Sequence, residues 1–345
     1  MAAKKKKRVA ILGASGYGGS ELLRLLLSHP SVEVARITSR QHAGFPVWRV
    51  HPHLLHVSEL AFEDTDPKAA AQDVDLVFSA LPHGASQEAV LALPPGTRVI
   101  DLSGDFRLKD PLAYQRAYGH EHRGPERLAE FVYGLTEFNR PRLLTTRAVA
   151  TPGCFATGVL LALMPLALEG LLDVPVAVNG VTGSSGSGVE PKAGTHHPER
   201  AEAFRAYKPL THQHLPEIAQ QLGQAGAGDV PLAFVPHSAP MVRGIHITAT
   251  LYPKKSFDGA AVRALYARHY GEERFVRLVD QPPDCAVVAG SNFADVYATA
   301  DGRAVTVLVA LDNLVKGMSG QAVQNMNLML GLPEHDGLSF PGTRP

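Results

Sequence analysis

A glycine-rich turn near the N-terminus constrains the fold of this chain more than any other feature. Residues 8–12 are β-branched or apolar and predict a short strand, and residues 20–27 carry leucines at helical spacing. Between them lies Gly13-Ala14-Ser15-Gly16-Tyr17-Gly18-Gly19. Glycine lets the chain turn tightly and lets an anion approach the backbone N–H groups that open a helix. The segment predicts a strand–turn–helix unit that binds a dinucleotide, a tight turn without a ligand being the alternative.

The two halves of the sequence differ in their pattern of predicted elements. In the first half, further strands at 32–38, 74–79 and 99–102 alternate with helical segments, which indicates a parallel sheet with helices on its faces. The second half has strands at 174–181, 232–235, 244–252, 294–299 and 304–311, but only one clear helix between them, at 260–270. That density favours an α+β domain with a largely antiparallel sheet. Residues 182–209 predict a long loop at a functional site.

Size and charge exclude several classes of protein. A chain of 345 residues is too long for one ordinary core, so we expect two domains. Lys and Arg number 33, as do Asp and Glu, and this balance gives no overall attraction to nucleic acid or an anionic membrane. Two cysteines, Cys154 and Cys285, cannot form a disulfide framework. Without a signal peptide or a membrane-spanning run, the expected location is cytoplasmic.

The end of the second predicted strand indicates which dinucleotide is bound. NAD-binding proteins usually place an acidic residue there, to bond the ribose 2′-OH. Here the strand ends in Thr38-Ser39-Arg40, where Ser39 and Arg40 suit a 2′-phosphate and no acid competes. This favours NADP(H), the alternative being a surface arginine. Leu81-Pro82-His83 follows another strand of the same sheet and is either a nicotinamide-side loop or an ordinary turn.

Cys154 follows Pro152-Gly153 and precedes a helix predicted at 155–168. The dipole and free N–H groups of a helix N-terminus favour a thiolate and can stabilise an oxyanion on its adduct. A thiolate beside a nicotinamide would act through a thioester or a thiohemiacetal. The alternative is a buried packing cysteine, an interpretation that fits Cys285 better.

His212, His214 and Glu217 form a second cluster of titratable residues. One histidine could transfer protons and pair with the thiolate. A metal site is the rival, but zinc needs three or four convergent ligands and the sequence supplies no others nearby, so we expect no metal. Arg107 and Arg243, each beside a predicted strand, carry the guanidinium forks that suit carboxylate or phosphate, unless they are surface or salt-bridge residues.

These segments together resemble the N-acetyl-γ-glutamyl-phosphate reductase family, relatives of aspartate-semialdehyde dehydrogenase. The likeness covers nearly the whole chain and rests on residues 13–19, 39–40, 101–108, 152–154, 184–188, 212–218, 235–245 and 312–331. It implies an α/β fold, with a Rossmann-type NADP-binding domain formed by residues 1–150 and 313–345. It also implies an inserted α+β catalytic and dimerisation domain, residues 151–312, after which a helix at 313–330 returns to the nucleotide domain.

The resemblance also implies an NADPH-dependent reduction of an acyl phosphate. Cys154 would attack the acyl phosphate and expel phosphate, NADPH would reduce the thioester, and a semialdehyde would leave. His214 or His212 would be the acid–base, with Glu217 nearby, and Arg107 and Arg243 would bind the substrate. The expected cofactor-binding residues are Gly13, Ser15, Gly16, Tyr17, Gly18, Ser39, Arg40, Leu81, Pro82, His83, Ser185, Gly186 and Asn313. A homodimer or homotetramer is expected, and an NADP-binding sensor and a plain alcohol-type dehydrogenase are the rival classes.

Two departures from the family concern the substrate. Members in arginine synthesis typically have Tyr-Pro-Thr after the cysteine, where this chain has Phe155-Ala156-Thr157, and the loop at 189–200 also differs. Both features are similar to a sister branch in lysine synthesis, which reduces α-aminoadipyl phosphate tethered to a small acidic carrier protein. A cationic rim for that carrier would consist of Lys192, His196, His197, Arg200, Arg205 and Lys208. We therefore expect carrier-linked L-2-aminoadipyl 6-phosphate, with carrier-linked glutamyl phosphate as a further substrate. The alternatives are N-acetyl-γ-glutamyl phosphate and loop charges that are merely solvated.

Overall fold

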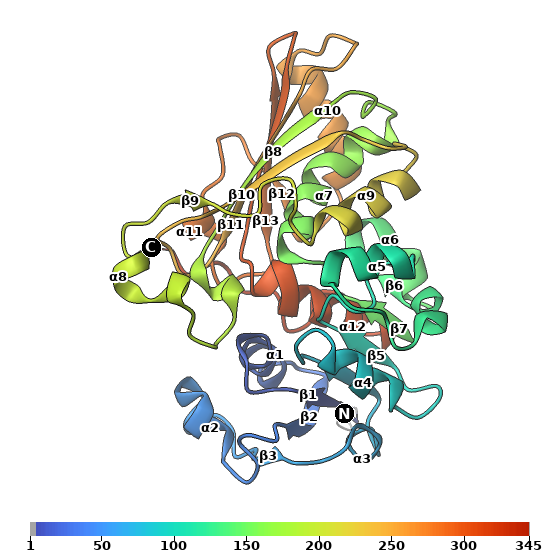
Figure 1. Cartoon of the computed structure of the whole chain (residues 1–345), viewed down its shortest axis with the longest axis vertical. Coiled ribbons are helices and arrows are strands. Elements are labelled where there is room, and N and C mark those ends of the chain that lie inside the picture. Colours follow the sequence, from blue (N-terminus) through green and yellow to red (C-terminus); the bar gives the residue numbers. More distant parts are fainter. Residues whose placement is uncertain (1–4, 345) are drawn as a thin grey trace. The chain divides into compact units, whose positions relative to one another are not determined.

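The computed structural model describes residues 5–344 and divides into two compact units (Figure 1). Unit 1 comprises the chain up to Pro152 together with Met318–Ser339, and unit 2 comprises Gly153–Gly317 and the chain from Phe340 onward. Unit 2 is therefore an insertion within the sequence of unit 1. The sequence-based boundaries, 150/151 and 312/313, lie a few residues away. The chain end joins unit 2 because the Thr343 N–H donates to the Ala289 carbonyl at 2.9 Å.

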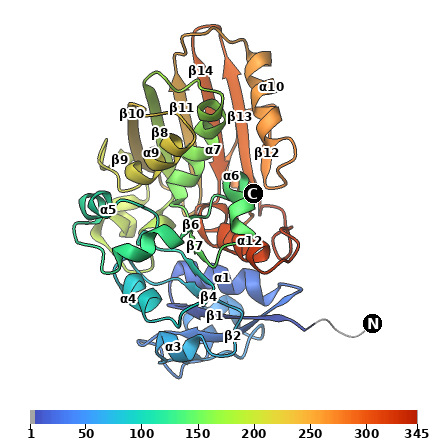
Figure 2. The same cartoon turned by 90° about the vertical axis from the view of Figure 1, so that its right-hand side faces the viewer.

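Unit 1 is built on a seven-stranded sheet in the order β3-β2-β1-β4-β5-β7-β6, all of whose pairs are parallel (Figure 2). The strands are β1 (Lys7–Leu12), β2 (Val32–Thr38), β3 (Phe62–Glu63), β4 (Leu76–Ser79), β5 (Val99–Asp101), β6 (Val132–Tyr133) and β7 (Ala148–Ala150). The strand order changes direction between β1 and β4. In such sheets the ligand binds beyond the carboxyl ends of the strands at this switch point.

Seven α-helices of the described chain belong to unit 1: α1 (Tyr17–Leu27), α2 (Val47–Val50), α3 (Pro67–Ala70), α4 (Ala85–Leu91), α5 (Pro111–Tyr118), α6 (Thr136–Leu143) and α12 (Gly320–Met329). The last of them, α12, packs against α1 and α6. Its Asn325 is fully buried, donates to the Gly134 carbonyl at 2.9 Å and accepts from the Thr136 hydroxyl at 2.8 Å. These bonds fix the returning helix to the unit in which the chain began.

Unit 2 contains a second seven-stranded sheet, in the order β12-β13-β14-β11-β8-β10-β9. Four of its pairs are antiparallel and two, β12 with β13 and β8 with β10, are parallel. The strands are β8 (Val176–Thr182), β9 (Arg205–Ala206), β10 (Leu232–Ser238), β11 (Ile245–Leu251), β12 (Val276–Leu278), β13 (Ala294–Ala300) and β14 (Val305–Leu311). The expected fold class, a parallel nucleotide-type sheet with an inserted, mostly antiparallel α+β domain, is confirmed.

Three helices cover one face of the second sheet: α7 (Cys154–Leu168), α9 (Leu215–Gln224) and α10 (Gly259–Tyr270). Helix α7 packs on β11 and β14, α9 packs on α7, and α10 packs on β13 (Figure 1). Nearly all of α7 is buried, which agrees with its almost unbroken apolar sequence. Gly158 lies so close to β11 that a Cβ there would be 2.7 Å from Ile247.

The structure corrects two predictions about local structure. The helix predicted at 313–330 is α-helical only over α12, because a π-helical turn, Val315–Ser319, precedes it. In that turn the Gly317 N–H donates to the Asp312 carbonyl at 2.9 Å, and a Cβ at Gly317 would lie 2.9 Å from the Cβ of Cys154. The predicted loop at 182–209 contains short elements: 3-10 turns Ser184–Ser187 and Ala193–Thr195, helix α8 (His197–Arg200) and strand β9.

Packing of α7 on β11 predicts an unusual result for a helical glycine. Replacing glycine by alanine inside a helix normally stabilises a protein by roughly 0.5–1 kcal/mol. We expect Gly158→Ala instead to lower the free energy of unfolding by about 1–3 kcal/mol, because the added methyl overpacks against Ile247. Gly223→Ala is the matched control, since a Cβ there would meet only the Gly228 carbonyl, at 3.8 Å. Urea unfolding of both variants measures the difference, and equal stabilisation by both would contradict this packing.

Candidate active site and nucleotide loop

The loop after β1 has the geometry that a pyrophosphate requires. Gly13 has a φ of +76°, and a Cβ there would lie 2.7 Å from the Leu81 side chain, which follows β4 at the switch point. The loop ends at Gly16, the N-cap of α1, where a Cβ would meet nothing within 4 Å. No side chain of residues 5–344 caps that helix. Its first N–H groups are therefore available to an anion, so these residues fit a dinucleotide.

Ser15 belongs to this loop, Ser39 contacts it, and Arg40 follows Ser39 in the chain. The Ser39 hydroxyl donates to that of Ser15 at 3.3 Å, and the Arg40 side chain is 94% exposed. The sequence showed no competing acid, but the structure places Asp64, just after β3, 4.0 Å from the Arg40 Nε. An ion pair this exposed is weak, so Arg40 can turn to another anion.

Tyr17 and Gly18 differ in what they offer at this site. Tyr17 is 40% exposed and can reach a bound ligand. The Gly18 carbonyl accepts a hydrogen bond from the Ser319 hydroxyl at 3.0 Å. A Cβ at Gly18 would also lie 3.2 Å from the Met318 methyl carbon. Gly18 therefore serves to bring α12 close to α1.

The Leu81-Pro82-His83 turn is held by a buried carboxylate that the sequence did not point to. Asp105 is fully buried and accepts from the N–H groups of Gly84 and Gln87 at 2.8 and 3.1 Å and from the Tyr114 hydroxyl at 2.9 Å. The Nδ1 of His83 accepts from the Gly104 N–H at 2.7 Å. Burial, together with the charge of Arg107, lowers the pKa of His83 to about 4. The turn is thus rigid and His83 is neutral near pH 7.

Arg107 supports the backbone of unit 1. It is only 6% exposed, and its Nε and Nη2 donate to the carbonyls of Thr151 and Leu102 at 2.8 and 3.2 Å. It therefore holds the segment that follows β7, three residues before Cys154 in the sequence. A role in substrate binding stays a prediction.

Unit 2 brings Cys154, His214 and Glu217 together. Gly153 is the N-cap of α7, Cys154 is its first residue, and the cysteine is half-buried. The Gly153 N–H donates to the Glu217 carboxylate at 3.1 Å. A Cβ at Gly153 would lie 2.5 Å from His214 Nε2 and 2.6 Å from Glu217 Oε1, so both side chains lie against this glycine. Cys154 thus meets His214 and Glu217, which lie about 60 residues further along the sequence, at the start of one helix.

The two histidines of the predicted pair occupy different environments. His214 Nε2 lies 3.9 Å from Glu217 Oε1, within reach of an ion pair when the ring is protonated. The Nδ1 of His212 instead accepts from the His214 backbone N–H at 3.2 Å, and its ring packs edge-on against Phe155 and Phe234. Burial, and secondarily the charge of Lys208, lowers the pKa of His212 to about 4. The ring of His212 is therefore neutral near pH 7.

Tyr207 joins this cluster and was missed from the sequence. Burial, followed by the nearby Cys154 thiol, raises the pKa of its hydroxyl, which remains a protonated donor. The next residues make a strained turn, in which Lys208 and Leu210 have φ values of 44° and 60°. Pro209 signals a turn here, but its strained geometry is not signalled, since neither lysine nor leucine favours a positive φ.

The remaining predicted residues of unit 2 form a second polar cluster. The Asn313 side chain accepts from the Gly244 N–H at 2.8 Å and donates to the Ser185 hydroxyl at 2.9 Å. Arg243 Nη1 lies 3.3 Å from Asp312 Oδ2. Gly186 sits near this cluster, because a Cβ there would be 3.9 Å from the Asn313 amide nitrogen. Cofactor binding by Ser185, Gly186 and Asn313 stays a prediction.

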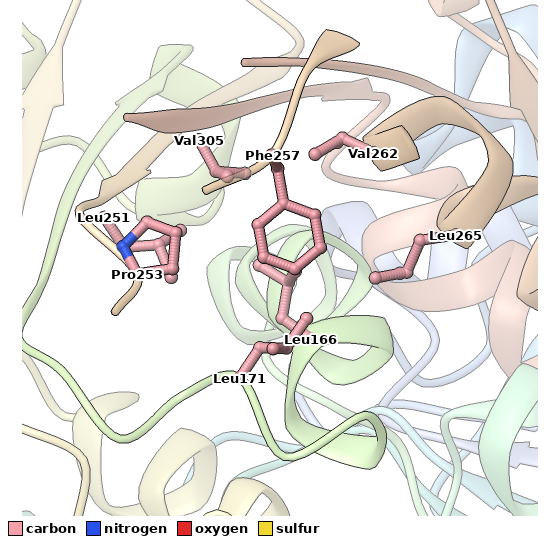
Figure 3. Close-up of a pocket in the computed structure, with 8 residues that line it drawn as sticks. All are labelled: Leu166, Leu171, Leu251, Pro253, Phe257, Val262, Leu265 and Val305. Atoms are coloured by element: carbon pink, nitrogen blue, oxygen red, sulfur yellow. The ribbon is translucent and has the colours of Figure 1, made fainter. Parts of the chain in front are cut away.

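One apolar hollow of unit 2 is not a ligand site. Figure 3 shows its lining, from the end of α7, from α10 and from the ends of β11 and β14: Leu166, Leu171, Leu251, Pro253, Phe257, Val262, Leu265 and Val305. It presents no polar group and has no room for a water molecule. Across residues 5–344 there is also no group of three His, Cys, Asp or Glu side chains that could hold a metal ion.

Comparison with known proteins identifies the family. Residues 8–146 match the family model described as semialdehyde dehydrogenase, NAD binding domain, and residues 154–313 match the semialdehyde dehydrogenase dimerisation domain. N-acetyl-gamma-glutamyl-phosphate reductase of Methanopyrus kandleri is 48% identical over 98% of this chain and 99% of its own length. The chain belongs to the N-acetyl-γ-glutamyl-phosphate reductase family of semialdehyde dehydrogenases.

Other relatives and solved structures agree with this assignment. A Thermomicrobium roseum protein, provisionally named LysW-L-2-aminoadipate 6-phosphate reductase, is 46% identical over 98% of this chain and 99% of its own. Aspartate semialdehyde dehydrogenase II of Vibrio cholerae covers 95% of this chain and 99% of its own with a TM-score of 0.68 at 15% identity. The Candida albicans enzyme, solved with NADP, covers 94% and 98% with a TM-score of 0.63 at 13% identity. These two structures support the fold.

Membership in this family establishes what kind of protein the chain is. It is an enzyme, an oxidoreductase of amino-acid biosynthesis that acts on an aldehyde group with phosphate. A dinucleotide cofactor of the NAD(P) type is also confirmed, in agreement with the nucleotide-type sheet of unit 1 and its open helix N-terminus, and the preference for NADP(H) stays a prediction.

The environment of His212 predicts a pH-dependent stability. Its pKa is lowered from 6.5 to about 4 on folding, so the neutral ring stabilises the protein fully above pH 6.5, and this contribution is lost as the pH falls towards 4. The shift corresponds to about 3 kcal/mol. We expect His212→Asn, which cannot titrate, to reduce the fall in unfolding free energy between pH 7 and about pH 4.5 by roughly 2–3 kcal/mol. Urea unfolding at both pH values tests this, and an unchanged fall in the variant would contradict it.

Proposed function

We propose that this enzyme reduces a side-chain acyl phosphate to a semialdehyde through a thioester on Cys154. The observation that carries the proposal is the meeting of Cys154, His214 and Glu217 at the N-terminus of α7. A helix N-terminus favours a thiolate and supplies N–H donors to an oxyanion. A nucleophile, a titratable imidazole and a carboxylate that orients it are the parts that covalent catalysis needs.

Each residue of this cluster has a distinct part in the proposal. The Cys154 sulfur attacks the acyl carbon, the bond from carbon to the phosphate oxygen breaks, and inorganic phosphate leaves with the electron pair. His214 takes the proton of the Cys154 thiol. After hydride addition, the oxyanion of the thiohemiacetal re-forms the carbonyl as the carbon–sulfur bond breaks, the aldehyde leaves, and His214 returns its proton to the Cys154 sulfur. Glu217 orients His214 and satisfies the Gly153 N–H. NADPH supplies the hydride that the thioester requires.

His214 is the better candidate for the acid–base. The Nδ1 of His212 is occupied by its own backbone turn, and its pKa lies far below the working range of a base. His212 instead supports His214, since their rings meet at right angles with centroids 4.6 Å apart. Tyr207, whose pKa is raised by burial and by Cys154, keeps its proton and would serve as a hydrogen-bond donor beside the sulfur.

For NADP(H), we propose that Ser39 and Arg40 hold the 2′-phosphate. Loop residues Ser15 and Gly16 and the N-terminus of α1 would hold the pyrophosphate. The substrate anions would fall to Arg243 and Arg107, whose guanidinium groups suit carboxylate or phosphate.

N-acetyl-γ-glutamyl phosphate is the first candidate substrate. The Methanopyrus kandleri relative carries this activity in its name, as does a Desulforudis audaxviator relative at 43% identity. The exposed loop charges also weaken the case for a carrier. Lys192, Arg205 and Lys208 are balanced there by Glu190, Glu199 and Glu202. Arg200, predicted to belong to the cationic rim, is 9% exposed and donates to the Ser238 hydroxyl and to the Ala239 and Met241 carbonyls.

Carrier-linked aminoadipyl 6-phosphate is the second candidate. It is favoured by the Thermomicrobium roseum relative and by Phe155-Ala156 after the cysteine. His196 and His197, two residues of the predicted cationic rim, are exposed. Cytoplasmic location also stays a prediction; in residues 5–344 no helix has the length and apolar character to cross a membrane.

Phosphate-dependent reduction of NADP by the purified enzyme tests the function. N-acetylglutamate semialdehyde and carrier-linked aminoadipate semialdehyde are offered in parallel, and we expect activity on the first that requires phosphate or arsenate. Cys154→Ala should lower the rate by at least about 1000-fold without changing NADPH affinity, because the nucleophile is lost. His214→Gln should remove the acid limb of the pH profile, whereas His212→Gln should keep it. Activity on only the carrier-linked aldehyde would select the second candidate, and phosphate-independent turnover would exclude the acyl-phosphate chemistry.

The uncovered face of the second sheet supports the proposal of a homodimer. Its central strands expose side chains without formal charge: Ala177, Asn179 and Val181 on β8, His246, Thr248 and Thr250 on β11, and Thr306 and Leu308 on β14. Helices α7, α9 and α10 cover the opposite face (Figure 1). The matching family model is described as a dimerisation domain. The uncharged side chains on these central strands suit contact with a second copy of the chain.

Placing a charge on this face should break the assembly. Thr248 lies on the central strand β11, opposite Asn179 and Leu308. An unpaired charge buried in an interface costs roughly 3–5 kcal/mol, so Thr248→Arg should give a monomer. Gln224→Arg, at the exposed end of α9, is the matched control and should leave the mass unchanged. Light scattering with size exclusion measures both, and an unchanged dimer in Thr248→Arg would place the interface elsewhere.

A further inference from the structure

Asp312 lies at the end of β14 and connects three parts of unit 2. Its side chain is fully buried. Oδ1 accepts from the N–H groups of Leu314 and Val315 at 2.8 and 3.1 Å. Oδ2 accepts from the Gly290 N–H at 2.6 Å and lies 3.3 Å from Arg243 Nη1. One carboxylate thus fixes the start of the π-helical turn, the turn at Gly290 and an arginine side chain.

The groups bonded to Asp312 connect it with the proposed substrate-binding arginine and with the proposed nucleophile. Arg243, with a side chain 32% exposed, is the proposed ligand of the substrate anion. The π-helical turn carries Gly317, which lies against Cys154 and whose N–H donates to the Asp312 carbonyl. The neighbouring Asn313 accepts from the Gly244 N–H, next to Arg243 in the chain. Residues 312–317 therefore form a strap that runs from the arginine to the nucleophile.

We propose that Asp312 is a positioning residue, which orients the Arg243 guanidinium for the anionic group of the substrate. This inference rests on the proposed function and on the role given there to Arg243. An arginine on a flexible stem samples many rotamers, and a charged hydrogen bond to one Nη fixes the plane of the fork. Catalysis is sensitive to such placement, since an error of about 1 Å can cost about 100-fold in rate. The carboxylate itself is immobile because backbone N–H groups hold both of its oxygens.

The same unit offers a matched control. Asp295 on β13 is 3% exposed and binds Arg277 through two bonds, of 2.6 and 2.9 Å. It is likewise a buried carboxylate that holds a partly exposed arginine in the same sheet. Neither Asp295 nor Arg277 belongs to the proposed site. The variant Asp295→Asn therefore measures the effect of removing a buried carboxylate charge that plays no part in orienting Arg243.

The test is a double-mutant cycle in the full-length enzyme, with Asp312→Asn, Arg243→Gln and the combination. We expect Asp312→Asn to lower kcat/KM by about 10- to 100-fold, mainly through KM, because the substrate anion loses an oriented partner. On the Arg243→Gln background it should cost less than about twofold further, since the two changes remove the same interaction. NADPH affinity, measured by fluorescence, should stay at the wild-type value in all variants. Asp295→Asn should leave kcat/KM unchanged.

Each other outcome has a distinct meaning. Multiplicative losses in the double variant, or a wild-type kcat/KM in Asp312→Asn, would overturn the positioning role. A wild-type rate in Arg243→Gln would remove Arg243 from the site and this inference with it, while leaving the Cys154 chemistry intact. A wild-type enzyme that reduces none of the acyl phosphates would instead refute the proposed function.

A second variant covers the case in which Asp312→Asn does not fold. Arg243→Lys keeps the positive charge beside Asp312 but has one charged nitrogen in place of a planar fork. A single ammonium cannot serve both Asp312 and the substrate, so we expect a loss within about threefold of that in Arg243→Gln. Retention of more than about half of the wild-type kcat/KM would show that an oriented fork is not needed.

Discussion

The buried start of α7 is the constraint on which the rest of unit 2 depends. An apolar helix that begins inside the protein leaves N–H groups that need partners, and an unpaired one costs about 1–3 kcal/mol. Glu217 supplies a partner by accepting from Gly153, although it is itself only 1% exposed. Satisfying the helix end therefore brings a carboxylate to the nucleophile, and the histidine one turn before it comes too. The same requirement excludes a side chain at Gly153, because His214 and Glu217 fill that space.

In unit 1, by contrast, the N-terminus of the first helix is left open. The N-terminus of α1 is left without a side-chain cap, and the chain reaches it through Gly13, which packs against Leu81 at the switch point of the sheet. Uncapped donors at a solvent-accessible helix end suit a phosphate ligand. One helix end is thus closed by protein groups around a reactive sulfur, and the other is left open for the anion of a cofactor.

Much of the fold could be predicted from the sequence, because hydrophobic periodicity reports burial directly. Strand β2 has the predicted bounds, and β11 and β14 differ by a residue at their ends. The short strands β3 and β6 were missed, since two residues carry no periodicity. The helix predicted from Asn313 was wrong at its start, because tertiary contact with Cys154 through Gly317 overrides the local pattern. Gly317 is a sequence feature that argues against a regular helix at this point, because an isolated glycine disfavours a helix.

The candidate site shows the same limit more sharply. Cys154, His214 and Glu217 were predicted because each stands in a short segment of suggestive composition. Tyr207 and Asp105 were not, since their positions follow from long-range packing around a strained turn and a buried network. Arg200 was assigned to the surface by its charge, although backbone carbonyls and the Ser238 hydroxyl hold it inside. Residue type alone does not distinguish a solvated charge from a buried one.

Two buried carboxylates of unit 2 hold functional side chains in the same way. Glu217 and Asp312 each accept backbone N–H groups at the start of a helical turn, and each also faces one cationic or titratable side chain, His214 or Arg243. Backbone bonds fix the carboxylate, and the fixed carboxylate then restricts the flexible side chain. A functional group is more accurately placed through such rigid supports than through its own rotamer preferences. In the proposed mechanism these carboxylates therefore act mainly on their neighbours, while the chemistry would fall to the Cys154 sulfur, the His214 imidazole and the Arg243 guanidinium.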